Sequence, residues 1–145
     1  MTIELSYDRL GSRLKKIGDF ELEYDMIGNR PRRLGKAELG YDLLGSRLRR
    51  VGDLEIGYDL AGSRPRHVGQ HELEYDMIGS RLRRIGDIEI EYDMIGSRVS
   101  RIGDVQVDYD ALGARARYLT RDDGSPLDQR MATLIFLVLV AFEQD

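Results

Sequence analysis

One stretch decides the fold of this chain: ELEYDMIGSRLRRIGDI, residues 72–88. It contains a Tyr-Asp pair, a glycine four residues after the tyrosine and an arginine six residues after it. This pattern recurs seven times at a spacing of 17 residues, with its tyrosines at Tyr7, Tyr24, Tyr41, Tyr58, Tyr75, Tyr92 and Tyr109. A spacing kept this strictly indicates one small structural unit that is copied and stacked along the chain.

The repeated unit predicts a β-hairpin. Polar and apolar residues alternate over 72–76 and again over 88–94, as in a strand with one buried face. Between the strands, 76–79 predicts a three-residue loop closed by a left-handed glycine, and Gly86-Asp87 predicts a two-residue type II′ turn. The predicted fold is mainly β: an antiparallel meander of about seven 17-residue β-hairpin repeats forming a curled sheet over residues 1–119. Two glycines per unit argue against a helical repeat.

These turn lengths also predict which side chains face each other. Tyr75 is expected opposite Arg81, and Arg81 opposite Tyr92, so that each arginine lies between two tyrosines on the buried face. A guanidinium over a phenol ring contributes about 0.5–1 kcal/mol where it is exposed. The predicted structural ladder consists of Tyr24, Arg30, Tyr41, Arg47, Tyr58, Arg64, Tyr75, Arg81, Tyr92, Arg98 and Tyr109.

The opposite face of the sheet is expected to carry a row of alternating acidic and basic residues. Two prolines conflict with the predicted strand register. The row is Glu72–Arg84–Glu89–Arg101, where a network is worth more than isolated surface pairs. Pro31 and Pro65 occupy the position of Leu82, whose N–H the predicted register uses in the ladder. Either the return strands are interrupted in these two units, or the register is slipped.

The tail differs from the repeats. After a linker at 120–125, Ser125 as N-cap and Pro126 in the first turn predict a C-terminal helix over 126–145. Residues 131–142 are apolar on every side but fewer than the roughly 20 needed to span a bilayer. A helix of this kind is normally buried, on the sheet or wrapped by it. A helix that joins copies, membrane insertion and a strand remain alternatives.

Composition narrows the classes of function. With 22 basic and 26 acidic residues the net charge is −4, which argues against a nucleic-acid partner. No cysteine is present, and Met1-Thr2-Ile3-Glu4 does not resemble a signal peptide, so the expected location is cytoplasmic. His67 and His71 lie in one degenerate unit, where sequence drift is a simpler explanation than metal binding or catalysis. No enzyme, metal or cofactor is predicted.

The loop tips carry apolar residues where turns usually have polar ones. Stacked along one edge, such residues form a strip that either marks a contact surface or folds inward against the tail. The predicted interaction residues are Met26, Ile27, Leu43, Leu44, Met77, Ile78, Met94 and Ile95 in the tips, and Leu134, Phe136 and Leu137 in the tail.

The segment YDMIGSRL, residues 75–82, resembles the tyrosine-aspartate (YD) repeats of bacterial Rhs-type and toxin-shell proteins. The resemblance covers the seven units and not the tail. It implies β-sheets that spiral into a hollow shell around a passenger. It also implies that Tyr75, Asp76, Gly79 and Arg81 are structural residues of the repeat.

Two hypotheses for function follow. The sheet is expected to end in open edges at 3–7 and 115–119, which lack protecting prolines or a lysine row. The first hypothesis is therefore a non-enzymatic structural or scaffolding protein that forms homo-oligomers through sheet edges or the C-terminal helix. The alternative is a binding module that presents its Tyr/Arg face to a carbohydrate, a peptide or another protein. An enzyme would require a cleft with clustered titratable groups, and no membrane partner is expected.

Overall fold

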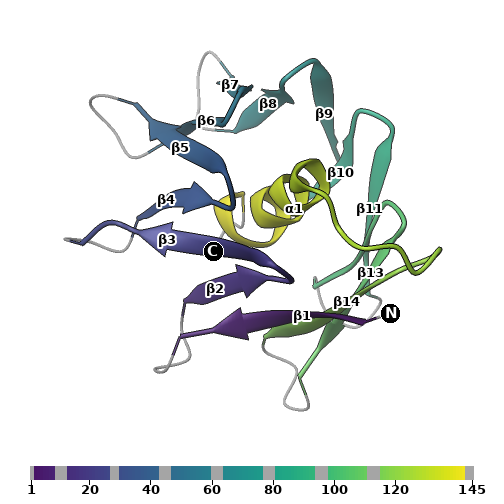
Figure 1. Ribbon diagram of the computed structural model, residues 1–145. Coiled ribbons are helices and arrows are strands. Elements are labelled where there is room, and N and C mark those ends of the chain that lie inside the picture. The colour runs from purple at the N-terminus through teal and green to yellow at the C-terminus, as the bar shows by residue number, and fades with distance from the viewer. Residues whose placement is uncertain are drawn as a thin grey trace.

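The chain folds into a closed β-barrel around its own C-terminal helix. The computed structural model describes residues 2–8, 13–26, 30–42, 47–59, 64–76, 81–93, 98–110 and 115–142. Fourteen antiparallel strands follow one another around the barrel in chain order. Figure 1 looks into the barrel, with helix α1 in the middle of the ring of strands. The predicted curled meander of hairpins and the predicted C-terminal helix are thus confirmed.

The strands are short and even in length. Their bounds are β1 Thr2–Tyr7, β2 Leu14–Ile17, β3 Phe20–Tyr24, β4 Pro31–Leu34, β5 Ala37–Tyr41, β6 Leu48–Val51, β7 Leu54–Tyr58, β8 Pro65–Val68, β9 His71–Tyr75, β10 Leu82–Ile85, β11 Ile88–Tyr92, β12 Val99–Ile102, β13 Val105–Tyr109 and β14 Ala116–Arg121. One 17-residue unit therefore supplies two strands, and seven units supply the whole wall.

The expectation of open sheet edges is wrong. The first and last strands pair with each other, in the register Thr2↔Thr120, Ile3↔Leu119 and Glu4↔Tyr118. Full closure removes the unpaired N–H and C=O groups that an edge would present to another chain.

Each of the seven hairpins contains a β-bulge, which corrects the predicted register. Leu82 and Ile85 are three residues apart, yet both are buried, at 7% and 0% exposure. A regular strand would point them to opposite faces, and a bulge between Leu82 and Arg84 turns both inward. Tyr75 consequently pairs with Leu82 and Glu74 with Arg84, so the predicted pairs Tyr75–Arg81 and Glu72–Arg84 are wrong.

Beyond the connecting turn the predicted register is confirmed, because Arg84 pairs with Glu89 and Ile85 with Ile88. The bulge also resolves the conflict with proline. Pro31 is the first residue of its strand and pairs with Tyr24, as Pro65 does with Tyr58. The first position of a strand tolerates proline, so the register is slipped and the strands are not interrupted.

The two ends of the barrel differ. At one end, Gly86 has φ +58° and no described residue other than glycine has positive φ, as the predicted type II′ turn requires. At the other end, the Asp76 amide donates to the Arg81 carbonyl over 3.0 Å. The predicted three-residue loop closed by Gly79 lies outside the described residues. We name these ends the turn end and the loop end.

The core combines the inner wall with the tail. One residue from each unit forms a ring that is 0–2% exposed: Ile17, Leu34, Val51, Val68, Ile85, Ile102 and Leu119. Inside this ring lie α1, Gln129–Phe136, and the π-helical segment η1, Leu137–Ala141. Every residue from Met131 to Val138 is at most 9% exposed. Among the described residues, no helix has both the length and the apolarity to cross a membrane.

The helix begins later than predicted. Asp128 is the N-cap, and its side chain accepts a 2.8 Å hydrogen bond from the Met131 amide. The prediction of Ser125 as N-cap is wrong, because its amide and hydroxyl both donate to Oδ1 of Asp123. The segment 122–128 is thus the link that leads from the wall into the barrel.

Candidate functional site

Every unit contributes one tyrosine, one aspartate and one arginine to a continuous ring at the loop end, which we call the YDR ring. Each strand that ends in tyrosine places its ring inward against the core. The tyrosine hydroxyl donates to the carbonyl of the residue ten positions earlier, as Tyr75 does to Pro65 over 2.6 Å. The seven bonds of this type are 2.6–2.8 Å long.

The arginines link neighbouring units. The Arg81 guanidinium lies 4.5 Å from the centre of the Tyr92 ring, and its Nε is 2.9 Å from Oδ2 of Asp76. All seven arginines repeat this arrangement, with ring distances of 4.2–4.5 Å. Their ion pairs to the aspartate five residues earlier span 2.7–3.6 Å. Each guanidinium is therefore held by the aspartate of its own unit and the tyrosine of the next.

The same contacts seal the seam between the first and last units. Tyr7 donates to the Ala116 carbonyl over 2.7 Å, and Arg115 lies 4.3 Å from the centre of the Tyr7 ring. These residues are 109 and 108 positions apart, yet they make the contacts that other units make with their immediate neighbours. The ring thus has no structural beginning or end.

Burial and charge both act on the ring's titratable groups. Burial is the largest influence on the pKa of Tyr41 and Tyr75 and raises each to about 12, while the Arg30 and Arg64 guanidiniums oppose it. The pKa of Tyr24, Tyr58 and Tyr92 is also raised, mainly by burial. The hydrogen bond from Arg47 is the main reason that the pKa of Asp42 is lowered. At neutral pH the ring therefore consists of neutral phenols and ion pairs.

The predicted ladder is only partly matched. The structure brings all of its tyrosines and arginines together, and each arginine stacks on the tyrosine of the next unit while it forms an ion pair with the aspartate of its own unit. The signal that sequence reasoning missed is the aspartate, which we expected only to open a turn. Asp and Arg recur five residues apart in every unit, so their pairing could have been inferred from the repeat.

The helix is fastened to the turn end by side chains of its first turn. Gln129 donates from Nε2 to the Leu34 carbonyl over 3.0 Å and accepts from the Lys36 amide over 3.2 Å. Arg130 contacts Nε2 of His71 at 2.7 Å. Because a guanidinium only donates, this nitrogen is the acceptor. His71, which we attributed to sequence drift, is thus a contact between wall and helix.

The predicted interaction residues differ in their exposure to solvent. Met26 is 97% exposed, whereas Leu134, Phe136 and Leu137 are at most 2% exposed, inside the barrel of a single copy. The other tip residues, Ile27, Leu43, Leu44, Met77, Ile78, Met94 and Ile95, lie outside the described residues.

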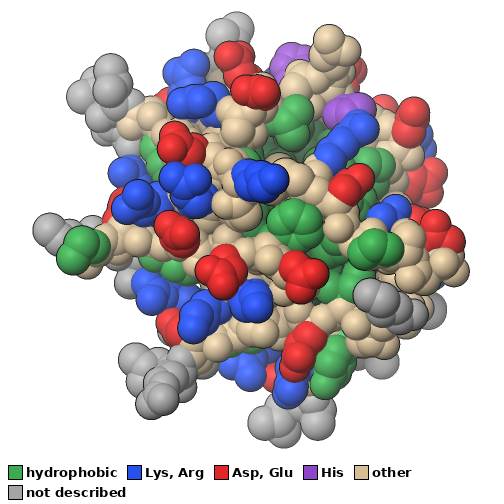
Figure 2. Space-filling model, in the orientation of Figure 1, with side chains coloured by type: hydrophobic (Ala, Val, Ile, Leu, Met, Phe, Trp, Pro, Cys, Tyr) green, Lys and Arg blue, Asp and Glu red, His purple; other side chains and the backbone are tan. Residues whose placement is uncertain are grey.

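The outer wall carries a belt of charge, which we call the outer belt. In each unit one outward side chain of the return strand faces a residue ten positions earlier across the strand pair. The seven pairs are Ser6–Lys16, Glu23–Arg33, Gly40–Arg50, Gly57–His67, Glu74–Arg84, Glu91–Arg101 and Asp108–Tyr118. Figure 2, which like Figure 1 looks onto one end of the barrel, shows basic and acidic side chains interspersed on that end, with apolar groups near its centre.

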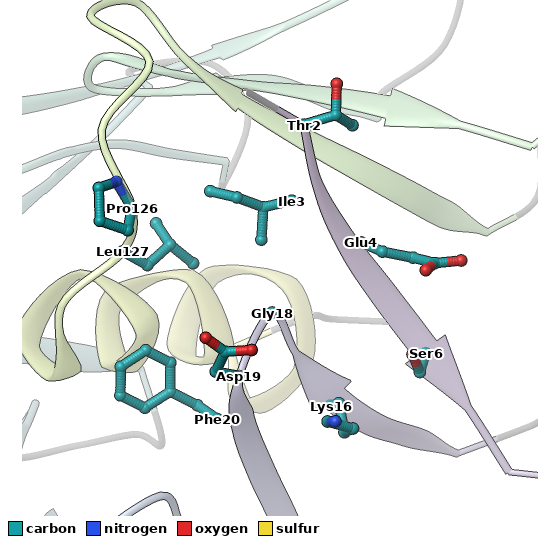
Figure 3. A pocket seen from close by; sticks show the side chains of 10 residues that line it. All are labelled: Thr2, Ile3, Glu4, Ser6, Lys16, Gly18, Asp19, Phe20, Pro126 and Leu127. Atoms are coloured by element: carbon teal, nitrogen blue, oxygen red, sulfur yellow. The ribbon is translucent and has the colours of Figure 1, made fainter.

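One pocket opens between the linker and strands β1 to β3. Its volume is about 320 Å³, and its apolar lining includes Ile3, Phe20, Pro126 and Leu127, with Asp19 and other polar residues around them. Figure 3 shows these four apolar side chains around one space, with Asp19 beside Phe20. No histidine or cysteine lines it. Elsewhere in the described part of the chain, no cluster of three or more His, Asp or Glu residues could hold a metal ion.

The chain was compared with known proteins at three levels. No family model, no curated protein and no solved structure matches it.

Proposed function

We propose that this chain is a non-enzymatic structural module that self-associates. The YDR ring supports the structural role, because the polar residues that recur in every unit contact one another and hold the wall closed. A repeat whose Tyr, Asp and Arg side chains are used in this way is a building element. The resemblance to YD repeats of shell proteins, which stays a prediction, agrees with such a role.

Self-association would use the outer wall. The two routes first considered, sheet edges and the tail helix, are both occupied within one copy. The outer belt remains as an extended charged surface, on which exposed groups of opposite sign face solvent. Charge complementarity of this kind directs association and fixes register.

Sedimentation equilibrium of the full chain tests this function. One copy has a mass of 16.6 kDa. We expect an average mass that rises above this value with concentration at low salt and falls when salt is added, because exposed ion pairs are screened. A mass of one copy at every concentration up to about 1 mM would overturn the proposal.

A second candidate function rests on the pocket between the linker and strands β1 to β3. In this alternative the chain is a binding module, and the pocket takes a small ligand that combines an apolar ring with a positive charge, which suits Phe20 and Asp19. Titration of the labelled chain with benzylamine tests it. We expect amide NMR shifts at Gly18 and Asp19 that Asp19→Asn reduces. Unmoved amides at about 10 mM ligand would exclude this class of ligand.

A further inference from the structure

Two neighbouring units break the outer belt in the same way. The break lies at the belt position that precedes the tyrosine and faces the return strand. Five of the seven units carry a polar or acidic residue there: Ser6, Glu23, Glu74, Glu91 and Asp108. Units three and four carry Gly40 and Gly57 there, on β5 and β7. The basic belt side chains opposite them are Arg50 and His67.

The fold does not require these glycines. Neither has positive φ, so the backbone admits any L residue. A Cβ at Gly40 would come within 3.3 Å of the Arg50 guanidinium, and one at Gly57 within 3.2 Å of Nδ1 of His67. Both neighbours are ends of flexible side chains. The equivalent position also accommodates Glu23, 3.9 Å from Arg33. Because glycine weakens a strand and often marks close approach by another molecule, its use in two adjacent units indicates a contact site.

The glycines leave Arg50 and His67 without a carboxylate across the strand pairs β5–β6 and β7–β8, although Glu55 and Glu72 face them across the other two strand pairs, β6–β7 and β8–β9. Arg50 and His67 are both exposed. Among the described residues neither forms an ion pair, and the one hydrogen bond of the Arg50 side chain goes to the Gly52 carbonyl at 3.4 Å. By contrast, Arg33 and Arg84 form ion pairs with Glu38 and Glu89, which hold the register positions of Glu55 and Glu72 in their own units.

The opposite charge is present elsewhere on the same wall. Glu74 and Glu91 are exposed, and within the described part of the chain neither carboxylate has an ion pair, since Arg84 and Arg101 pair with Glu89 and Asp122. Glu74 and Glu91 lie one unit apart, as Arg50 and His67 do. One unit is two strands, so both spacings are about 10 Å. A hollow of about 370 Å³, lined in part by Arg98 and Asp108, lies beside Glu91.

We propose that the partner of the Arg50/His67 surface is a second copy of this chain, which docks its Glu74/Glu91 surface there. The carboxylates of the second copy then occupy the places that Gly40 and Gly57 leave open. This inference rests on the proposed self-association and names its surfaces. A second copy is the partner chosen because each chain carries both sets, at a spacing that matches from one copy to the next.

The positions of the surfaces decide the kind of assembly. The two sets are centred on β7 and β10, three of 14 strands apart, or about 77° around the barrel. That separation leaves room for two neighbours of equal diameter side by side on one copy. Contact between unlike surfaces is heterologous, and it produces a ring or an open chain of copies.

Restoring the carboxylates tests the site. In the variant Gly40→Glu/Gly57→Glu, the new carboxylates lie across the strand pairs from Arg50 and His67, as Glu23 lies across from Arg33. We expect sedimentation equilibrium to show at least about tenfold weaker self-association, because the added carboxylates face Glu74 and Glu91 of the second copy and repel them. Unfolding by urea should show a stability no lower than that of the unchanged chain. Lys16→Glu, a belt position outside both surfaces, is the control and should associate as the unchanged chain does.

Charge exchange tests the identity of the partner. Arg50→Glu/His67→Glu and Glu74→Arg/Glu91→Arg should each be monomeric, and their mixture should associate again. If the unchanged chain associates but Gly40→Glu/Gly57→Glu associates equally well, this inference is overturned while the proposed function stands. If both reversed variants are monomeric and their mixture also stays monomeric, the two surfaces do not contact each other, and this inference is overturned. If the unchanged chain never associates, both proposals fail.

Discussion

Replacing Phe136 by alanine tests whether the tail helix fills the barrel. Phe136 is 1% exposed. A buried phenylalanine removes about 150 Å² from water, which at about 25 cal/mol per Å² corresponds to about 4 kcal/mol. Core substitutions of Phe by Ala cost about 3–5 kcal/mol, because the cavity collapses only in part. Since a domain is stable by about 5–15 kcal/mol, Phe136→Ala should lose a large share of the total.

Unfolding by urea, followed by far-UV circular dichroism, measures this loss as a shift of the midpoint at unchanged slope. Met26→Ala is the matched control, because Met26 is 97% exposed and its loss should change the unfolding free energy by no more than about 0.5 kcal/mol. A loss below about 1 kcal/mol for Phe136→Ala would refute the reasoning, since the side chain would then lie outside the core. Phe136→Leu should cost about 1–1.5 kcal/mol.

Three further predictions concern the wall. Tyr41→Phe removes the 2.6 Å hydrogen bond to the Pro31 carbonyl and should lower the unfolding free energy by about 0.5–1.5 kcal/mol. An unchanged urea midpoint would contradict this prediction. Gly86→Ala places an L residue at φ +58° and its Cβ 2.5 Å from Nδ1 of His71, so the unfolding free energy should fall by about 1–2 kcal/mol or more. Gly40→Ala is the control, because Gly40 does not have positive φ. An equal loss of unfolding free energy in both variants would exclude backbone conformation as the cause. Alkaline pH should destabilise the barrel, because the pKa of Tyr41 and Tyr75 is about 12 in the fold and 10.0 ordinarily. The folded state then holds these protons more tightly, so the contribution of these two tyrosines to the unfolding free energy is fully present below pH 10 and is lost from pH 10 to 12. Urea titrations at stepped pH, with tyrosinate absorbance in parallel, measure it, and rising stability over this range would show the sign to be wrong.

The register shows how far sequence reasoning reached. Alternating polar and apolar residues and the Gly-Asp turns predicted both strands of each hairpin, and the pairing across those turns is confirmed. The pairing across the other loop was wrong, because the three-residue spacing of Leu82 and Ile85 was not taken as evidence for a bulge. The prolines at 31 and 65 pointed to the same error. Here the information was in the sequence, in the interval between apolar residues.

Other features of the candidate site could not be inferred from one unit. The outer belt becomes a surface only when the bulge turns two adjacent residues outward, as with Arg49 and Arg50, both of which are exposed. Gly40 and Gly57 are visible as departures from the repeat. Their meaning depends on Arg50 and His67 lying opposite them across the strand pair.

The sequence by itself determined the local structure: seven hairpins built on one pattern, their turn chemistry, and an apolar helix that needs burial on every side. These follow from periodicity and backbone preference, which act over a few residues. Only the tertiary structure decided that the sheet closes and that the helix lies within it. Closure joins Tyr7 to Arg115 and β1 to β14, and it depends on strand twist and bulges accumulated over all seven units. The helix fills the space inside the closed wall, and the two edge strands pair with each other. The contact surfaces that the sequence predicted are therefore both used within one chain.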